Sequence, residues 1–152
     1  MLPEPAKLIR AEPASMTQAT GAFSVAMTPT SPDLDPETQQ SLLPAPLARL
    51  QLLKYYSGDL QATGRGQMLT AMTEVEGSAG YVAIEQVEGM LHGKQGSFVL
   101  QHSGTMARGQ PQLSISIVPD SGTGDLFGIS GVCRIVLQDG GHSYVLDYEL
   151  HG

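Results

Sequence analysis

The stretch YVAIEQVEGMLHGKQGSFVLQHSGTM (residues 81–106) decides the fold of this chain. Its two outer parts, Tyr81–Glu88 and Ser97–Met106, each divide into two faces at a period of two residues, as β-strands do. In the second part, apolar residues occupy most of one face, and hydroxyl and amide side chains occupy most of the other. The residues between the two parts, HGKQG (92–96), are typical of a tight turn. The stretch therefore predicts an antiparallel hairpin.

The same pattern of short strands and glycine-bearing turns continues in both directions from this hairpin. The strongest turn signal is Asp139-Gly140-Gly141, because primed hairpin turns need a positive φ, which glycine adopts without strain. Short connections make consecutive strands antiparallel neighbours, and eight such strands favour closure into a barrel. The predicted fold class is therefore all-β, an eight-stranded antiparallel β-barrel, with an open sandwich as the alternative. The expected strands are residues 21–28, 49–56, 60–73, 81–88, 97–106, 113–118, 127–137 and 142–150.

Glycine and proline are distributed differently along this predicted barrel. Glycines inside the strands, such as Gly64, Gly66 and Gly104, indicate bulges or corners that let a small barrel curl. Prolines instead crowd residues 29–47, a segment that can be neither a central strand nor a long helix. We interpret this segment as a proline-rich excursion between the first two strands and as a candidate lid, with room for one helical turn at Pro36–Leu43.

Composition limits the class of protein. A length of 152 residues fits one domain, and we expect a flexible N-terminal tail (residues 1–20) followed by a single β-barrel domain (residues 21–152). The net charge of −7 leaves no basic stripe for nucleic acid, and the apolar runs are too short for a membrane-spanning helix. Prolines interrupt the N-terminus where a signal peptide needs an apolar core, and the single cysteine cannot form an internal disulfide. These features predict a cytoplasmic protein.

Two titratable residues are candidate catalytic residues. His102 is in phase with the apolar residues of its strand, so it is either a buried histidine bonded to a backbone carbonyl or a functional group, as a general base or a ligand-binding residue. Glu85 shares a face with Tyr81. If that face points inward, Glu85 is a costly buried acid whose pKa is raised. If it points outward, Glu85 pairs across strands, for instance with Arg134.

Other side chains suit either a ligand-binding lining or ordinary core packing. An eight-stranded barrel can hold one small apolar ligand, and the candidate ligand-binding residues are Tyr56, Tyr81, Met106 and Tyr148. Cys133 lies among apolar residues and is interpreted as a small core residue rather than a nucleophile. The histidines are scattered, and no phosphate loop, dinucleotide fingerprint or nucleophile elbow occurs, so we expect neither a metal nor a cofactor.

Four segments carry a resemblance to a known family: YSGDL (56–60), GYVAIE (80–85), GSFVLQHSG (96–104) and VPDSGTGDL (118–126). The chain resembles, over about residues 21–150, a bacterial family of small proteins of unknown function. The resemblance implies an eight-stranded antiparallel barrel similar to that of allene oxide cyclase, and a homo-oligomer. It implies no activity and no catalytic residue. In the proline-rich segment the chain departs from this family, whose members carry an aromatic-containing segment there.

The sequence leaves three functions open, and with them whether the protein is an enzyme. The first is a binding barrel for a small apolar ligand. The second is an isomerase or cyclase that acts on a hydrophobic substrate through Glu85 or His102, by analogy with the fold. The third is a structural or interaction module that acts through its oligomer interface. A reachable cavity containing Glu85 or His102 favours the first two functions, whereas a packed interior favours the third.

Overall fold

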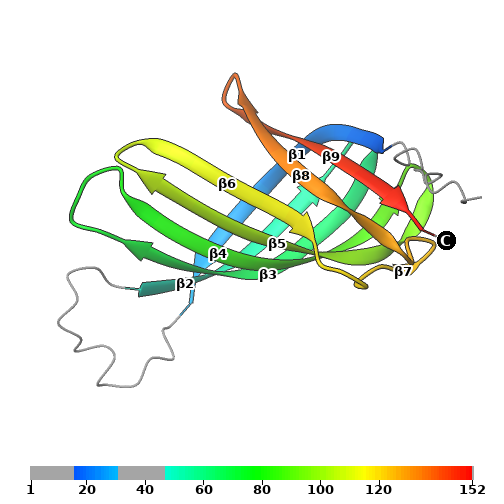
Figure 1. Ribbon diagram of the computed structural model, residues 1–152, viewed down its shortest axis with the longest axis horizontal. Coiled ribbons are helices and arrows are strands. Elements are labelled where there is room, and N and C mark those ends of the chain that lie inside the picture. Colours follow the sequence, from blue (N-terminus) through cyan, green and yellow to red (C-terminus); the bar gives the residue numbers. More distant parts are fainter. Residues whose placement is uncertain (1–15, 31–46, 152) are drawn as a thin grey trace, which may run out of the picture.

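The structure is a computed structural model, and it describes residues 16–30 and 47–151. These residues form strands, turns and bends, with no helix among them (Figure 1). The strands are β1 (Thr17–Pro29), β2 (Leu47–Tyr56), β3 (Leu60–Met72), β4 (Ala79–Leu91), β5 (Lys94–Ala107), β6 (Gln110–Ile117), β7 (Thr123–Gly124), β8 (Ile129–Gln138) and β9 (Gly141–Leu150).

Eight of the nine strands close into an antiparallel barrel, as the sequence predicts. Each strand from β1 to β5 pairs with the next along the chain, β8 pairs with β6 and β9, and β9 pairs with β1 to complete the ring. The two-residue β7 lies in the connection from β6 to β8 and pairs with β5. The β6–β8 seam is short, with only Ile115 opposite Cys133 and Ser116 opposite Val132, and the two strands diverge from there (Figure 1).

Three hairpin turns have the same two-residue form. His92-Gly93, Arg108-Gly109 and Asp139-Gly140 have positive φ at both residues, with values of 49° and 80°, 50° and 89°, and 45° and 78°. Such type I′ turns match the right-handed twist of the strands that they join. Because these turns are so tight, the strands run further than their hydrophobic pattern predicts: β4 ends at Leu91 and β5 begins at Lys94, inside the expected loop.

The first strand also begins earlier than the sequence pattern predicts. Residues Thr17–Thr20 pair with β9, and Ala19 among them is completely buried. The described end of the expected tail is therefore part of the barrel wall, because its backbone completes the ladder of β9. The expected helical turn at Pro36–Leu43 and the body of the candidate lid lie outside the described residues.

One end of the barrel interior is filled. The connection from β6 to β8 covers this end, and its Leu126 is 1% exposed in the main apolar cluster. The strands contribute Leu91, Phe98 and Ile129 to the same cluster, all of them buried. We call this end, which carries the β4–β5 turn, the closed end.

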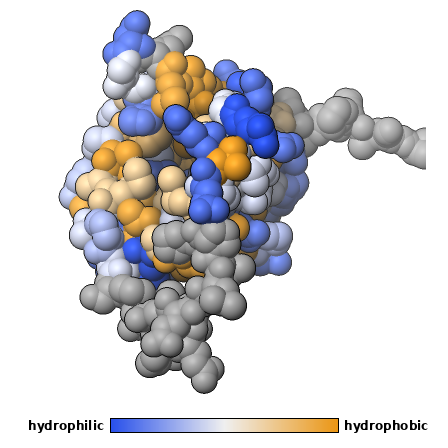
Figure 2. Space-filling model, turned by 90° about the vertical axis from the view of Figure 1, so that its left-hand side faces the viewer, coloured by the Kyte–Doolittle hydropathy of each residue, from blue (hydrophilic) through white to orange (hydrophobic). Residues whose placement is uncertain are grey.

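The opposite end, which carries the β3–β4 and β5–β6 turns, is the open end. Its inward-facing side chains are also apolar, yet Met72, Met106 and Leu113 are 57%, 43% and 44% exposed. Figure 2 shows hydrophobic side chains gathered on the face of the molecule at this end. The interior is therefore packed at one end and accessible at the other.

Three of the glycines inside the strands do not form bulges, and two of them make room for neighbouring side chains. β3, β4 and β5 stay in unbroken register past Gly64, Gly66 and Gly104, so the predicted bulges are wrong at these three positions. A Cβ at Gly64 would lie 2.1 Å from Oε2 of Glu85, and a Cβ at Gly104 would lie 2.5 Å from the ring of Tyr81. These two glycines leave room for large inward-facing side chains on the neighbouring strand.

Candidate functional site

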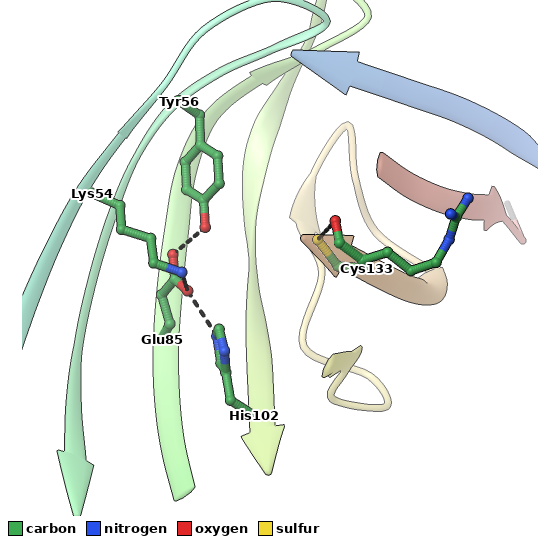
Figure 3. Close-up of polar contacts among 6 residues, drawn as sticks. Lys54, Tyr56, Glu85, His102 and Cys133 are labelled. Atoms are coloured by element: carbon green, nitrogen blue, oxygen red, sulfur yellow. Dashed lines mark hydrogen bonds and ion pairs between the residues drawn. The ribbon is translucent and has the colours of Figure 1, made fainter. Parts of the chain in front are cut away.

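A buried group of polar side chains lies inside the barrel, on β2, β4 and β5 (Figure 3). β2 contributes Lys54 and Tyr56, β4 contributes Glu85, and β5 contributes His102, each in the inward-facing phase of its strand. Their exposed fractions are 6%, 7%, 0% and 3%. We call these four residues the inner cluster.

Glu85 is the centre of the inner cluster. Its Oε1 accepts hydrogen bonds from Nζ of Lys54 at 3.0 Å and from Nε2 of His102 at 2.9 Å. Its Oε2 accepts a hydrogen bond from the hydroxyl of Tyr56. A buried carboxylate is tolerated only when it is paired and hydrogen-bonded, and both oxygens of Glu85 meet that condition.

These contacts reverse the electrostatic expectation for Glu85. The residue is buried, and burial alone raises the pKa of its carboxyl group, as the sequence analysis expects for an inner face. The hydrogen bond from His102, the charge of Lys54 and the hydrogen bond from Tyr56 act in the opposite direction and hold the pKa below its usual value. The expectation of a raised pKa is therefore wrong, because the barrel surrounds the carboxylate with donors. Burial and the adjacent carboxylate raise the pKa of the Tyr56 phenol, which stays protonated.

Lys54 is the member of the inner cluster that the sequence analysis does not identify. Its ammonium lies 5.0 Å from the ring centroid of Phe23 and 5.9 Å from that of Tyr56, in addition to its bond to Glu85. Aromatic faces of this kind favour a partly desolvated cation. The signal was present in β2, where Lys54 is in phase with Leu52 and Tyr56, both of them buried.

A cavity of about 270 Å³ lies at the open end, and its lining does not include the inner cluster. Gly104 lines it and lies two residues from His102 on the same inward face of β5, while Met68 lines it from β3. The ring of Tyr81 packs over Gly104 inside the cavity. Other inward-facing side chains that line the cavity are Thr70, Met72, Met106 and Leu113.

Comparison with known proteins identifies the family. A family model described as a protein of unknown function, DUF3224, matches residues 19–148. The chain belongs to the DUF3224 family. It is similar to a solved structure of a DUF3224 protein of unknown function from Shewanella oneidensis MR-1, with 44% sequence identity and a TM-score of 0.84. The match covers 91% of this chain and 99% of the Shewanella chain, whereas no curated protein matches.

The resemblance to a family of unknown function is thus confirmed, and so is the barrel. The comparison with allene oxide cyclase stays a prediction, as do the homo-oligomer and the cytoplasmic location. In the residues that the structure describes, no helix is long and apolar enough to cross a membrane. Across the same ranges, no group of three or more His, Cys, Asp or Glu side chains could hold a metal ion.

This DUF3224 chain brings together most of the site residues predicted from sequence. Glu85 and His102 are in direct contact with each other, Tyr56 bonds to the same carboxylate, and Tyr81 and Met106 line the cavity at the open end. Tyr148 is separate from them, because its hydroxyl lies 2.6 Å from Nδ1 of His92 at the β4–β5 turn of the closed end. The roles assigned to these residues stay predictions.

Two alternatives considered for Glu85 and His102 are wrong. Arg134 lies 3.6 Å from Asp147 on the neighbouring strand and does not pair with Glu85. His102 is bonded to the Glu85 carboxylate and not to a backbone carbonyl. In both cases the partner lies on the adjacent strand of a hairpin, β4–β5 for His102 and β8–β9 for Arg134.

The reactivity of the Cys133 thiol on β8 measures how far the barrel interior excludes water. Cys133 lies on the opposite wall from the inner cluster (Figure 3), and burial raises the pKa of its thiol to about 12. At pH 8 only about one thiol in 10⁴ is then ionised, against about one in 10 at its ordinary value of 9.0. We expect Ellman's reagent to modify the folded protein about 1,000-fold more slowly than the urea-unfolded protein at pH 8. Equal rates in the two states would contradict the raised pKa of this half-buried thiol.

Proposed function

We propose that this DUF3224 protein binds a small, largely apolar molecule in the open end of its barrel. The observation that supports this proposal is the exposure of inward-facing apolar side chains there, Met72, Met106 and Leu113. Their exposure to water is unfavourable in free energy, because the burial of apolar surface stabilises a protein. The inward-facing apolar residues at the closed end are buried, so they do not add this unfavourable free energy.

The shape and chemistry of the cavity fit such a ligand. Its volume of about 270 Å³ is close to the lower end of the range for small-molecule sites. Methionine side chains are flexible and polarizable, so Met68, Met72 and Met106 can adjust to the outline of a ligand. The hydroxyl groups of Tyr81 and Thr70, which line the cavity, provide the few polar groups that orient a ligand in an apolar site.

Binding of N-phenyl-1-naphthylamine, a small neutral dye whose fluorescence rises in apolar surroundings, tests the proposal. We expect the wild-type protein to bind the dye with saturation. Leu113→Asp should weaken binding at least about tenfold, because it replaces an apolar contact with a charge in the cavity. Native mass spectrometry of the protein purified from its own host should reveal a retained small molecule, and the same spectrum gives the oligomer mass.

A matched control variant tests whether the dye binds on the outside of the barrel. An apolar groove lies on the outer surface of β2, β3 and β4, with Val82 on its wall, and Val82 is about as exposed as Leu113, at 52% and 44%. We expect Val82→Asp to bind the dye as the wild type does. If Val82→Asp loses the dye and Leu113→Asp keeps it, the outer groove is the binding site and the proposal is wrong.

A further inference from the structure

The ring of Tyr81 is held in a defined position in the wall of the open-end cavity. Tyr81 lies opposite Thr70 on β3 and Gly104 on β5, and all three residues line the cavity. A Cβ at Gly104 would lie 2.5 Å from Cε1 of Tyr81 and 3.2 Å from Cδ1 of Leu113, so the ring packs over the bare backbone of this glycine, next to Leu113. The place of the Tyr81 hydroxyl is therefore set before a ligand binds, which lowers the entropy cost of binding.

The hydroxyl of Tyr81 is unpaired and accessible. Within the described part of the chain it makes no hydrogen bond, and neither does the hydroxyl of Thr70. Among the same residues, the one buried side-chain atom that lacks a hydrogen-bond partner is Oε2 of Glu149, so both hydroxyls are open to water. A ligand in the cavity can take the place of that water and accept the hydrogen bond itself.

The cavity offers no counter-charge to a charged ligand. Among the residues that the structure describes, those that line the cavity include no Asp, Glu, Lys, Arg or His. Burial and the negative charge of Glu85 raise the pKa of the Tyr81 phenol, so this hydroxyl stays protonated and is a neutral donor at physiological pH. A ligand carboxylate or ammonium group would lose its hydration in this cavity without meeting an opposite charge, which is strongly unfavourable.

We propose that the open-end cavity selects a small apolar ketone or ester, whose carbonyl oxygen accepts a hydrogen bond from the hydroxyl of Tyr81. The inference rests on the proposed binding function and assigns the chemical class of the ligand. Thr70, opposite Tyr81 in the β3–β4 pair, adds a second hydroxyl to the same part of the wall. The apolar remainder of the ligand lies against Met72, Met106 and Leu113. Carboxylic acids and amines are excluded, because both are charged at neutral pH.

Two probes of the same shape test this selection by displacing N-phenyl-1-naphthylamine. 2-Acetylnaphthalene has a carbonyl oxygen, and 2-isopropenylnaphthalene has a methylene group in its place. Tyr81→Phe removes only the hydroxyl, so we expect it to weaken binding of the ketone about tenfold and that of the hydrocarbon less than about twofold. Each probe is compared with itself on two proteins, so the difference in hydrophobicity between the probes cancels. Tyr55→Phe removes the hydroxyl of a 56% exposed tyrosine on the outer face of β2 and should leave both affinities unchanged.

A third probe tests the exclusion of charge. 2-Naphthoate is close in size to the ketone but is an anion at neutral pH, and we expect it to bind the wild type at least about 100-fold more weakly than the ketone does. The inference is overturned if Tyr81→Phe leaves the ketone affinity unchanged, if it weakens both neutral probes equally, or if naphthoate binds as tightly as the ketone. Each of these results leaves the proposed function intact, whereas a wild-type protein that does not bind the dye overturns the proposed function itself.

Discussion

Glu85→Ala is expected to lower the free energy of unfolding by about 3–5 kcal/mol, the largest effect of any substitution considered for this protein. The substitution leaves the buried Lys54 ammonium without a counter-charge and removes the partner of both Tyr56 and His102. For a domain of this size the melting temperature should fall by roughly 10 °C. Urea unfolding and thermal circular dichroism measure the two quantities. Glu88→Ala, on the exposed face of the same strand, is the matched control and should change stability by less than about 0.5 kcal/mol.

A double-mutant cycle attributes this loss to the ion pair. Removing the cation as well, in Lys54→Met with Glu85→Ala, leaves no uncompensated charge in the barrel, so the double variant should be more stable than the sum of the two single changes predicts. Strict additivity would mean that the cost of Glu85→Ala comes from lost packing and not from the buried charge of Lys54.

The same carboxylate makes the stability of the protein depend on pH. Its pKa in the folded state is below the ordinary value of 4.5, so the unfolded chain binds the proton more tightly. The stabilisation from Glu85 is therefore fully present above about pH 4.5 and is lost as the pH falls through its lower folded value. Glu85→Gln cannot titrate, so its stability below pH 4.5 should fall less steeply than that of the wild type.

Gly64→Ala is expected to cost about 2–3 kcal/mol, the second largest effect. The added methyl group would lie 2.1 Å from Oε2 of Glu85 and 3.2 Å from the ring of Tyr56. Glu85 cannot move aside without giving up its bonds to Lys54 and His102, because all of these side chains are buried. Urea unfolding measures the change in stability.

Gly80→Ala is the control for this second prediction. Gly80 also lies in a strand, but the nearest atom to an added Cβ is 3.7 Å away, an ordinary contact, so its stability should be nearly that of the wild type. Combining Gly64→Ala with Glu85→Ala should be less damaging than the two separate losses together, since removal of the carboxylate makes room for the methyl group. Equal losses in Gly64→Ala and Gly80→Ala would contradict the tight fit around Glu85.

Part of the inner cluster can be predicted from the local sequence pattern. The two-residue turn at His92-Gly93 sets the register of β4 and β5, so Ala83 lies opposite His102 and Glu85 lies opposite Leu100. That register alone makes Glu85 and His102 diagonal neighbours on one face of a hairpin. Their contact was within reach of sequence reasoning once the turn was recognised.

The contact between Lys54 and Glu85 could not be predicted from the sequence in the same way. Lys54 is on β2, separated from β4 by the whole of β3, and a lysine on a strand is ordinarily solvated. Gly64 of β3 lies opposite Lys54 and has no side chain, so Lys54 can extend past β3 to Glu85. The sequence suggested a bulge at this glycine, because nothing in the local pattern shows that a carboxylate from the next strand occupies its space.

The sequence by itself determined the strands, the tight turns and the inward phase of each strand, because these depend on backbone conformation and on side-chain alternation within a few residues. It also determined the presence of a titratable pair, Glu85 and His102, among apolar positions. Only the tertiary structure decided that Glu85 is a stabilised anion and that one end of the barrel stays open. The first depends on the packing of β2, β4 and β5, which surrounds one carboxylate with donors from two other strands. The second depends on the β6–β8 connection, which fills the closed end alone.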